Sequence, residues 1–181
     1  MYLLLAALLV AADQATKWWA RTSFSGGGAQ ELGLGFSFTY VSNTGAAFGL
    51  LRDLNLAIGP LTVDGTVLLG VLSAIVALLL VWYLLKRGQM VPPLPRFALA
   101  LVLAGALGNM VDRLLLGFVV DFIHFRSGNF DFPVFNLADS FVVIGGALLF
   151  LGGLTGDPIE RDETRSLAEP DFFRKLDSKD R

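Results

Sequence analysis

TVLLGVLSAIVALLLVWYLL, residues 66–85, runs through 20 positions without a charged side chain. A helix needs about 20 mostly apolar residues to cross the hydrocarbon core of a bilayer, so this stretch is long enough to span one. Three further stretches approach the same length and composition, at residues 2–20, 97–116 and 137–156. The pattern therefore predicts an integral membrane protein, mainly α, with four transmembrane helices.

The composition of the chain favours the same class. Of its 181 residues, 54% are hydrophobic and 17% are charged, whereas soluble domains average about 45–50% apolar and about 25% charged. With no cysteine and a single histidine, His124, the chain can form no disulfide, thiolate metal site or multi-histidine site. The net charge of -2 and the lack of a basic patch argue against nucleic acid as a partner.

Charge is concentrated at the C-terminal end. Residues 157–181 hold 6 Lys/Arg and 8 Asp/Glu, almost half of the charged side chains. We therefore expect one membrane domain over residues 1–156 and a polar, disordered cytoplasmic tail over residues 157–181. No basic residue precedes the first apolar stretch, so it is expected to stay as a span rather than be cleaved as a signal peptide.

Basic residues predict the orientation of the spans. The connection 86–96 carries three Lys/Arg in 11 residues, whereas the longer connections 21–65 and 117–136 carry two and one. Short loops rich in Lys/Arg stay in the cytoplasm. Both termini are then cytoplasmic, and the two long connections face outward. Lys17 and Arg21, near the outer end of the first span, run against this rule.

The two outer connections carry their own patterns. Leu34, Phe36, Phe38 and Tyr40 alternate with small or polar residues, which is typical of a strand with one apolar face. Ser42-Asn43-Thr44-Gly45 follows as a turn signal, so a small outer sheet is expected within residues 24–60. The segment 122–135 is rich in phenylalanine and is expected to lie in the membrane interface, either as a lid or as a passive loop.

Several charged residues lie within the apolar stretches, where each costs about 3 kcal/mol to insert. Asp13 and Lys17 have the i, i+4 spacing of an ion pair that would ease insertion. Asn109, Asp112 and Arg113 share one helix face, and Gly105 and Gly108 beside them permit close helix packing. From the residues alone, this face is either a buried polar network that joins helices or part of a reactive site.

Two aspartates stand out at the outer boundary. Asp121 lies in an apolar run, so desolvation should raise its pKa. Asn136 is predicted to cap the fourth helix, which places Asp139 at its third position. Two carboxylates about 4 Å apart repel by about 4 kcal/mol at an effective dielectric near 20, so they share one proton. Such a pair supplies an acid and a base for cleaving an amide, and we expect Asp121 to be the more often protonated partner.

Five motifs in order resemble the lipoprotein signal peptidases (signal peptidase II). They are Asp13-Gln14-Ala15-Thr16-Lys17, Asn43-Thr44-Gly45-Ala46-Ala47-Phe48, Gly108-Asn109-Met110-Val111-Asp112-Arg113, Val119-Val120-Asp121-Phe122 and Phe135-Asn136-Leu137-Ala138-Asp139-Ser140. The resemblance implies a membrane aspartyl endopeptidase that removes the signal peptide of bacterial prolipoproteins. In that family the cut falls on the amino side of a cysteine that carries diacylglycerol.

The resemblance also assigns roles to residues. Asp121 and Asp139 match the catalytic pair, and Asp13, Lys17 and Gly108 match structural positions. The residues that match supporting or substrate-binding positions are Asn43, Asn109, Asp112, Arg113 and Asn136. Residues 24–60 match an outer β-cradle, part of 122–135 a mobile periplasmic helix, and the aromatics Phe36, Phe38, Tyr40 and Phe48 are placed to hold the substrate from above.

Further expectations concern the setting of the enzyme. The resemblance implies the bacterial inner membrane with the active site at the outer face, and inhibition by the cyclic depsipeptide globomycin. We expect a monomer in membrane lipid, with neither a metal nor another cofactor.

Two other functions remain open from the residues. One is a metal-dependent membrane enzyme of phospholipid metabolism, with Asp112, Asp121 and Asp139 on Mg²⁺; the spread of these acids over 28 positions counts against it. The other is a transporter or scaffold in which the buried charges form a proton path. A presenilin-type protease is disfavoured, because no Gly-x-Gly-Asp sequence occurs.

Overall fold

A computed structural model describes residues 1–45, 54–58 and 61–155. Its four long helices are α1 (Tyr2–Phe24), α2 (Gly65–Arg87), α3 (Pro93–Leu116) and α4 (Leu137–Thr155), and the short 3₁₀ helix η2 is Gly88–Met90. Its strands are β1 (Gln30–Gly33), β2 (Phe36–Asn43), β3 (Asn55–Ile58), β4 (Leu61–Asp64), β5 (Val119–Ser127) and β6 (Phe130–Phe135). The predicted tail and Phe48 lie outside the described residues.

All four predicted stretches are helices, and local signals set their ends. The Asp64 carboxylate accepts a hydrogen bond from the Val67 N–H, 2.8 Å away, and so caps α2. A proline occupies the first turn of α3, where its missing N–H costs nothing. Gly117 ends α3 in the left-handed conformation, with φ of 76°, which a residue without a Cβ adopts most easily.

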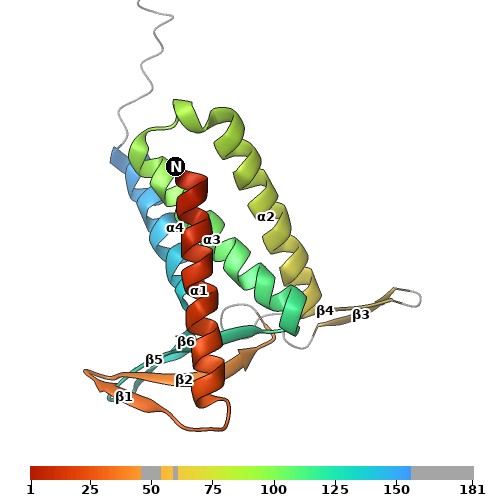
Figure 1. Cartoon of the computed structure of the whole chain (residues 1–181), viewed down its shortest axis with the longest axis vertical. Helices are drawn as coiled ribbons and strands as arrows, with labels where there is room; N and C mark the ends of the chain where they lie inside the picture. Colours follow the sequence, from red (N-terminus) through yellow and green to blue (C-terminus); the bar gives the residue numbers. More distant parts are fainter. Residues whose placement is uncertain (46–53, 59–60, 156–181) are drawn as a thin grey trace, which may run out of the picture.

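The helices alternate in direction, and a sheet lies across one end of them (Figure 1). The N-terminus and the α2–α3 connection lie at the opposite end. By length and hydropathy, Gly65–Met90 and Pro93–Leu116 are long and apolar enough to cross a membrane, whereas the apolar part of α4 is shorter. The apolar run of α1 is interrupted by Asp13, Lys17 and Arg21.

The sheet is antiparallel with the strand order β1-β2-β5-β6. Half of its strands therefore come from the connection between α3 and α4 rather than from residues 24–60. The strands β3 and β4 form a separate hairpin at the foot of α2 (Figure 1). The turn signal after β2 is confirmed, because the Asn43 side chain accepts a hydrogen bond from the Gly45 N–H, 2.9 Å away.

The prediction of a mobile helix within residues 122–135 is wrong, and so is that of a passive loop. This segment forms β5 and β6, in which Phe125 pairs in register with Phe36 of β2 and with Phe132 of β6. Aromatic and β-branched residues favour a pleated sheet when neighbouring strands supply partners. Pro133 is tolerated because β6 is an edge strand.

The tip of the β5–β6 hairpin carries an exposed ionic cluster. Asp131 contacts His124 Nε2 at 2.6 Å and the Arg126 guanidinium at 2.6 Å. These hydrogen bonds hold the pKa of Asp131 below its ordinary value, the His124 bond having the larger effect.

Leu34 differs from the predicted strand pattern, because it lies in the β1–β2 turn with φ of 53° and is 96% exposed.

Small residues form the core between the helices, and α3 contacts α1, α2 and α4. The buried cluster consists of Ala6, Ala77, Ala100, Leu103 and Ala104. Large apolar side chains instead lie on the outside, including Leu8, Val71, Leu78 and Leu115. Close packing through small residues under an exposed apolar surface is the arrangement of helices whose solvent is lipid.

Candidate active site

The polar site lies where the C-terminal halves of α1 and α3 and the start of α4 meet β2 and β5. Asp121 on β5 is 2% exposed, although an ionised carboxylate is among the least often buried groups. Its Oδ1 accepts a hydrogen bond from Asn136 Nδ2 at 2.7 Å, and its Oδ2 accepts one from Asn43 Nδ2 at 2.9 Å. Both of its oxygens are therefore held by amides from other elements.

Asp139 is held by the cap of α4, as the sequence predicts. The Asp139 N–H donates to Asn136 Oδ1 at 2.9 Å, and the Asn136 N–H donates back to Asp139 Oδ2 at 3.2 Å. This reciprocal pair is a capping box built from Asn and Asp. Asn109 Nδ2 donates to the other carboxylate oxygen of Asp139 at 2.7 Å.

Asn136 therefore joins the two aspartates. It is fully buried, its side-chain N–H reaches Asp121, and its backbone N–H reaches Asp139. Burial first, and the charge of the nearby Asp139 second, raise the pKa of Asp121 from 3.8 to about 7. The amides of Asn43 and Asn136 lower the same pKa by a smaller amount. This direction agrees with the expectation drawn from the apolar neighbours of Asp121.

A buried ion cluster supports the site from behind. Lys17 Nζ lies 2.9 Å from Asp13 Oδ2 and 3.1 Å from Asp112 Oδ2, and it donates to Asn109 Oδ1 at 2.9 Å. The predicted Asp13–Lys17 pair is confirmed, but it is one side of a larger network that reaches α3. A single cation between two buried carboxylates offsets part of the cost of burying them.

Each carboxylate of this cluster also accepts a hydrogen bond from a backbone N–H, one at the start of α4 and one at the start of β5. Asp13 Oδ1 accepts from the Ala138 N–H at 2.9 Å, and Asp112 Oδ2 accepts from the Val120 N–H at 2.9 Å. Ala138 directly precedes Asp139, and Val120 directly precedes Asp121. Lys17 thus links the two backbone anchors, which fixes the aspartates relative to each other.

Arg113 lies on the same face of α3 and turns toward the aspartates. Its guanidinium donates to the Gly45 carbonyl oxygen at 3.2 Å and to the Asn109 carbonyl oxygen at 3.4 Å. Its Nε is buried and has no hydrogen-bond partner among the described residues. Arg113 therefore keeps a donor free, whereas Asp112 pairs with Lys17 rather than with the neighbouring guanidinium.

Gly108 makes the contact between α1 and α3 possible. A Cβ at this position would lie 2.6 Å from Asp13 Oδ2 and 3.1 Å from the Ala138 side chain. Any larger residue would therefore push the carboxylate away from the start of α4. The close packing predicted for Gly105 and Gly108 is confirmed.

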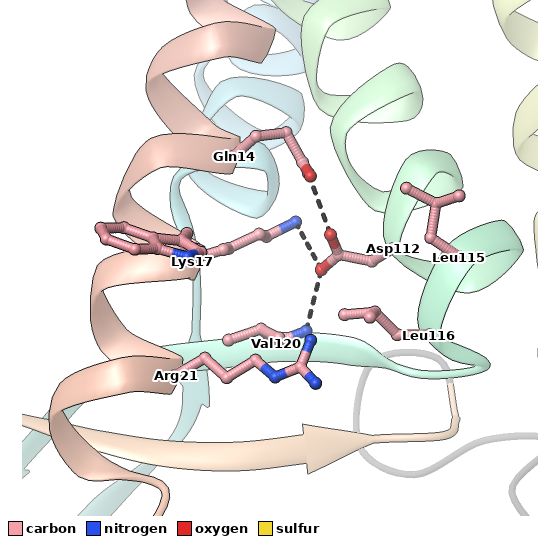
Figure 2. Close-up of a pocket in the computed structure, with 8 residues that line it drawn as sticks. Gln14, Lys17, Arg21, Asp112, Leu115, Leu116 and Val120 are labelled. Carbon is pink, nitrogen blue, oxygen red and sulfur yellow. Dashed lines mark hydrogen bonds and ion pairs between the residues drawn. The ribbon is translucent and has the colours of Figure 1, made fainter.

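Sequence reasoning assigned no role to Gln14. Its Nε2 donates to Asp112 Oδ1 at 2.9 Å and to the Gly108 carbonyl oxygen at 3.1 Å. Figure 2 shows Gln14 and Lys17 reaching together from α1 toward Asp112. The position of Gln14 in the sequence points to such a role, because it is a polar residue in an apolar stretch and shares a helix face with Lys17.

The predicted aromatic support is only partly free to act on a substrate. Phe38 packs against Trp19, with ring centroids 5.0 Å apart, and so helps to hold the sheet on α1. Phe36 packs against Phe125, with tilted rings whose centroids lie 4.7 Å apart.

The alternative of a Mg²⁺-dependent enzyme requires three acidic side chains that converge on one ion. In the described part of the chain, no three His, Cys, Asp or Glu side chains are placed to share an ion.

Known proteins with similar sequences are signal peptidases. A family model described as signal peptidase (SPase) II matches residues 5–155. The lipoprotein signal peptidase of Serratia proteamaculans is 40% identical over 152 residues, which is 84% of this chain and 85% of that protein. That of Symbiobacterium thermophilum is 40% identical over 153 residues, which is 82% and 91%.

Solved structures are similar as well. One, described as a bacterial membrane enzyme determined by the in meso method at 2.3 Å, has a TM-score of 0.70 and 34% identity over 84% of this chain and 87% of its own. A second, at 1.9 Å, has a TM-score of 0.68 and 31% identity over 86% and 94%. Because the family model covers most of the chain and the relatives align over more than four-fifths of it, this protein belongs to the signal peptidase II family.

Proposed function

We propose that this chain is a membrane aspartyl endopeptidase that removes the signal peptide from bacterial prolipoproteins. The cut falls on the amino side of the cysteine that carries diacylglycerol. The observation that carries the proposal is the link between Asp121 and Asp139 through Asn136. A buried carboxylate with a raised pKa and a half-buried one, both held by the same asparagine, match what acid–base cleavage of a peptide bond requires.

In the proposed reaction, Asp139 is the carboxylate and Asp121 is the carboxylic acid. Asp139 takes a proton from a water molecule while the water oxygen attacks the scissile carbonyl carbon. Asp121 gives its proton to the carbonyl oxygen, so that the intermediate is an uncharged gem-diol. Asp139 then passes its proton to the leaving nitrogen as the C–N bond breaks. A hydroxyl proton of the diol returns to Asp121, which restores the starting state.

The neighbouring polar residues position this pair and the substrate. Asn43 and Asn136 orient Asp121, and Asn109 orients Asp139. The free Nε–H of Arg113 is a donor for a backbone carbonyl of the bound peptide. No step needs a metal or another cofactor.

The proposed setting is the bacterial inner membrane, crossed by all four helices. The sheet lies at the end of the helices opposite the α2–α3 connection (Figure 1). That connection is flanked by Lys86 and Arg87 at the end of α2 and by Arg96 near the start of α3. This supports an outward-facing site with both termini in the cytoplasm. A lipid-modified substrate then arrives sideways, with its acyl chains in the bilayer and its scissile bond at the aspartates. The enzyme acts as a monomer, and globomycin inhibits it.

The decisive experiment is cleavage in detergent of a prolipoprotein with diacylglyceryl-cysteine, beside its unlipidated twin and with excess chelator. We expect only the lipidated form to be cut. The variants Asp121→Asn and Asp139→Asn should each lose about 10²–10⁴-fold in rate. Cleavage that returns only when Mg²⁺ is restored would instead support the metal-dependent alternative.

A further inference from the structure

A cavity lies between α1 and α3, and neither Asp121 nor Asp139 is among its lining residues. It has a volume of about 130 Å³ and is lined by one face of α1, the end of α3 and the start of β5. The lining residues are Gln14, Lys17, Trp18, Arg21, Asp112, Leu115, Leu116 and Val120 (Figure 2). The four residues from α1 follow the i, i+3, i+4, i+7 spacing of a single helix stripe.

Arg21 is the unexplained residue of this cavity. Its guanidinium projects from α1 toward Val120 and Leu116 (Figure 2), and within the described residues no hydrogen bond or ion pair occupies it. Its place in the last turn complements the helix dipole, but that interaction does not engage the side-chain N–H groups, which are exposed and can bind a ligand. At the outer end of a span, a free basic residue also runs against the usual distribution of Lys and Arg.

The other charges of the cavity are already paired. Lys17 has partners for its donors in Asp13, Asp112 and Asn109. The oxygens of Asp112 accept from Gln14, Lys17 and the Val120 N–H. A ligand that enters therefore meets one charged group with free donors, and that group is cationic.

Two of the lining residues present large apolar side chains on the surface of the molecule. Trp18 is 69% exposed and Leu115 is 76% exposed, and both continue the apolar outer surface of the helices. In the proposed membrane setting, this end of the helices, next to the sheet, lies at the membrane interface, where tryptophan is enriched. A ligand that fits this cavity has two parts. Its anionic group accepts hydrogen bonds from the planar guanidinium of Arg21, and its hydrocarbon chain covers Trp18 and Leu115.

We propose that this cavity binds an anionic phospholipid of the outer leaflet. The lipid phosphate accepts two hydrogen bonds from the Arg21 guanidinium, and one acyl chain lies along Trp18 and Leu115. The back wall of the cavity, Asp112, holds the Val120 N–H next to Asp121, so the bound lipid abuts the support of the catalytic aspartate. The proposal rests on the membrane setting given above and not on the peptidase chemistry.

Tryptophan fluorescence tests this site without any catalytic turnover. The chain has three tryptophans, so Trp19→Phe with Trp82→Phe leaves Trp18 as the single reporter. We would measure its quenching in nanodiscs that contain the same fraction of brominated phosphatidylglycerol or brominated phosphatidylcholine. The attraction of one Arg for an anionic lipid predicts about fivefold preference for phosphatidylglycerol. The same preference is expected when Asp121→Asn is added, which separates this result from the peptidase proposal.

Three variants make the test specific. Arg21→Gln should abolish the preference, and Arg21→Lys should retain part of it, because a lysine keeps the charge but loses the fork. The matched control Arg126→Gln, at an exposed arginine on the β5–β6 hairpin, should leave the preference intact. A second reporter, Trp82 alone on α2, should show equal quenching by both lipids.

Several outcomes would overturn the proposal. Equal quenching of Trp18 by both lipids would mean that no selective site exists. Equal losses in Arg21→Gln and Arg126→Gln would indicate diffuse attraction by surface charge. Relief of the excess quenching by inorganic phosphate would assign the cavity to a soluble anion instead. If Arg21→Gln does not fold, an unchanged preference in Arg21→Lys would likewise exclude recognition by the guanidinium fork.

Discussion

Asn136 makes three separate contributions to the site. Its side chain caps α4, its side-chain N–H orients Asp121, and its backbone N–H orients Asp139. The role as a cap is local and can be predicted from Pro133, Asn136 and the apolar run that follows. The bond to Asp121 cannot, because it depends on where β5 lies relative to α4.

At the residue scale, the raised pKa of Asp121 predicts the alkaline limit of activity. Asp121 must hold its proton to act as the acid, so kcat/KM should fall as the pH rises above about 7. The Asn43 amide lowers this pKa, so Asn43→Ala should move the inflection to higher pH. Cleavage assays across the pH range measure the inflection in the parent chain and in Asn43→Ala. An inflection that stays in place or moves to lower pH in Asn43→Ala would contradict the assignment of Asp121 as the acid.

The same pKa makes stability depend on pH. The folded-state pKa of about 7 lies above the ordinary 3.8, so the folded chain binds more protons than the unfolded chain between these values. The stabilisation from this group is complete below the lower pKa and is lost as the pH rises through the higher one. The gap corresponds to about 4 kcal/mol.

Thermal unfolding of Asp121→Asn in detergent checks this linkage. Asparagine does not titrate, so the Tm of the variant relative to the parent chain should rise between about pH 4 and about pH 8. The comparison uses the change with pH, because the substitution also alters the bonds with Asn43 and Asn136. A difference in Tm that is constant with pH would show that Asp121 does not titrate in this range.

At the scale of elements, one lysine ties three helices together. Lys17 joins α1 to α3 through Asp112, and its partner Asp13 joins α1 to the start of α4. The i, i+4 spacing predicts only the pair within α1. The contacts with α3 and α4 require Gly108, which lets α1 approach so closely that an added Cβ would touch Asp13.

Removal of that lysine should be costly. Lys17→Met leaves two buried carboxylates without their cation, and breaking a buried ion pair in this way costs about 3–5 kcal/mol. The backbone anchors at Val120 and Ala138 should loosen with it, so cleavage should fall as well. Lys86→Met, at an exposed lysine on α2, is the control, and its stability should stay within about 0.5 kcal/mol of the parent chain. Equal melting of the two variants would exclude the bridging role.

The elements also show where local patterns are insufficient. Residues 119–135 are aromatic-rich with one proline, and this composition suits an interfacial segment of several conformations. They form strands because β2 offers a paired edge, with Phe36 opposite Phe125. A strand pairing is a long-range contact, so its partner is not encoded in the segment itself.

At the scale of the whole molecule, the placement of the sheet predicts the topology. Because the chain has no cysteine, Asn129→Cys in the β5–β6 turn and Gln89→Cys in the α2–α3 connection each create a single label site. In intact spheroplasts, a membrane-impermeant maleimide should label Asn129→Cys and not Gln89→Cys. Labelling of Gln89→Cys should appear only after the membrane is permeabilised. The reverse pattern would invert the orientation and place the aspartates in the cytoplasm.

Composition and spacing predict the membrane class, the four helices and the cap of α4 at Asn136, because each depends on residues that lie close together in the chain. The folded chain alone reveals the four-stranded sheet, the link through Asn136, the anchors from Asp13 and Asp112, and the cavity beside Arg21. All of these join residues that lie far apart in the chain, and their energies depend on burial and close approach rather than on local sequence.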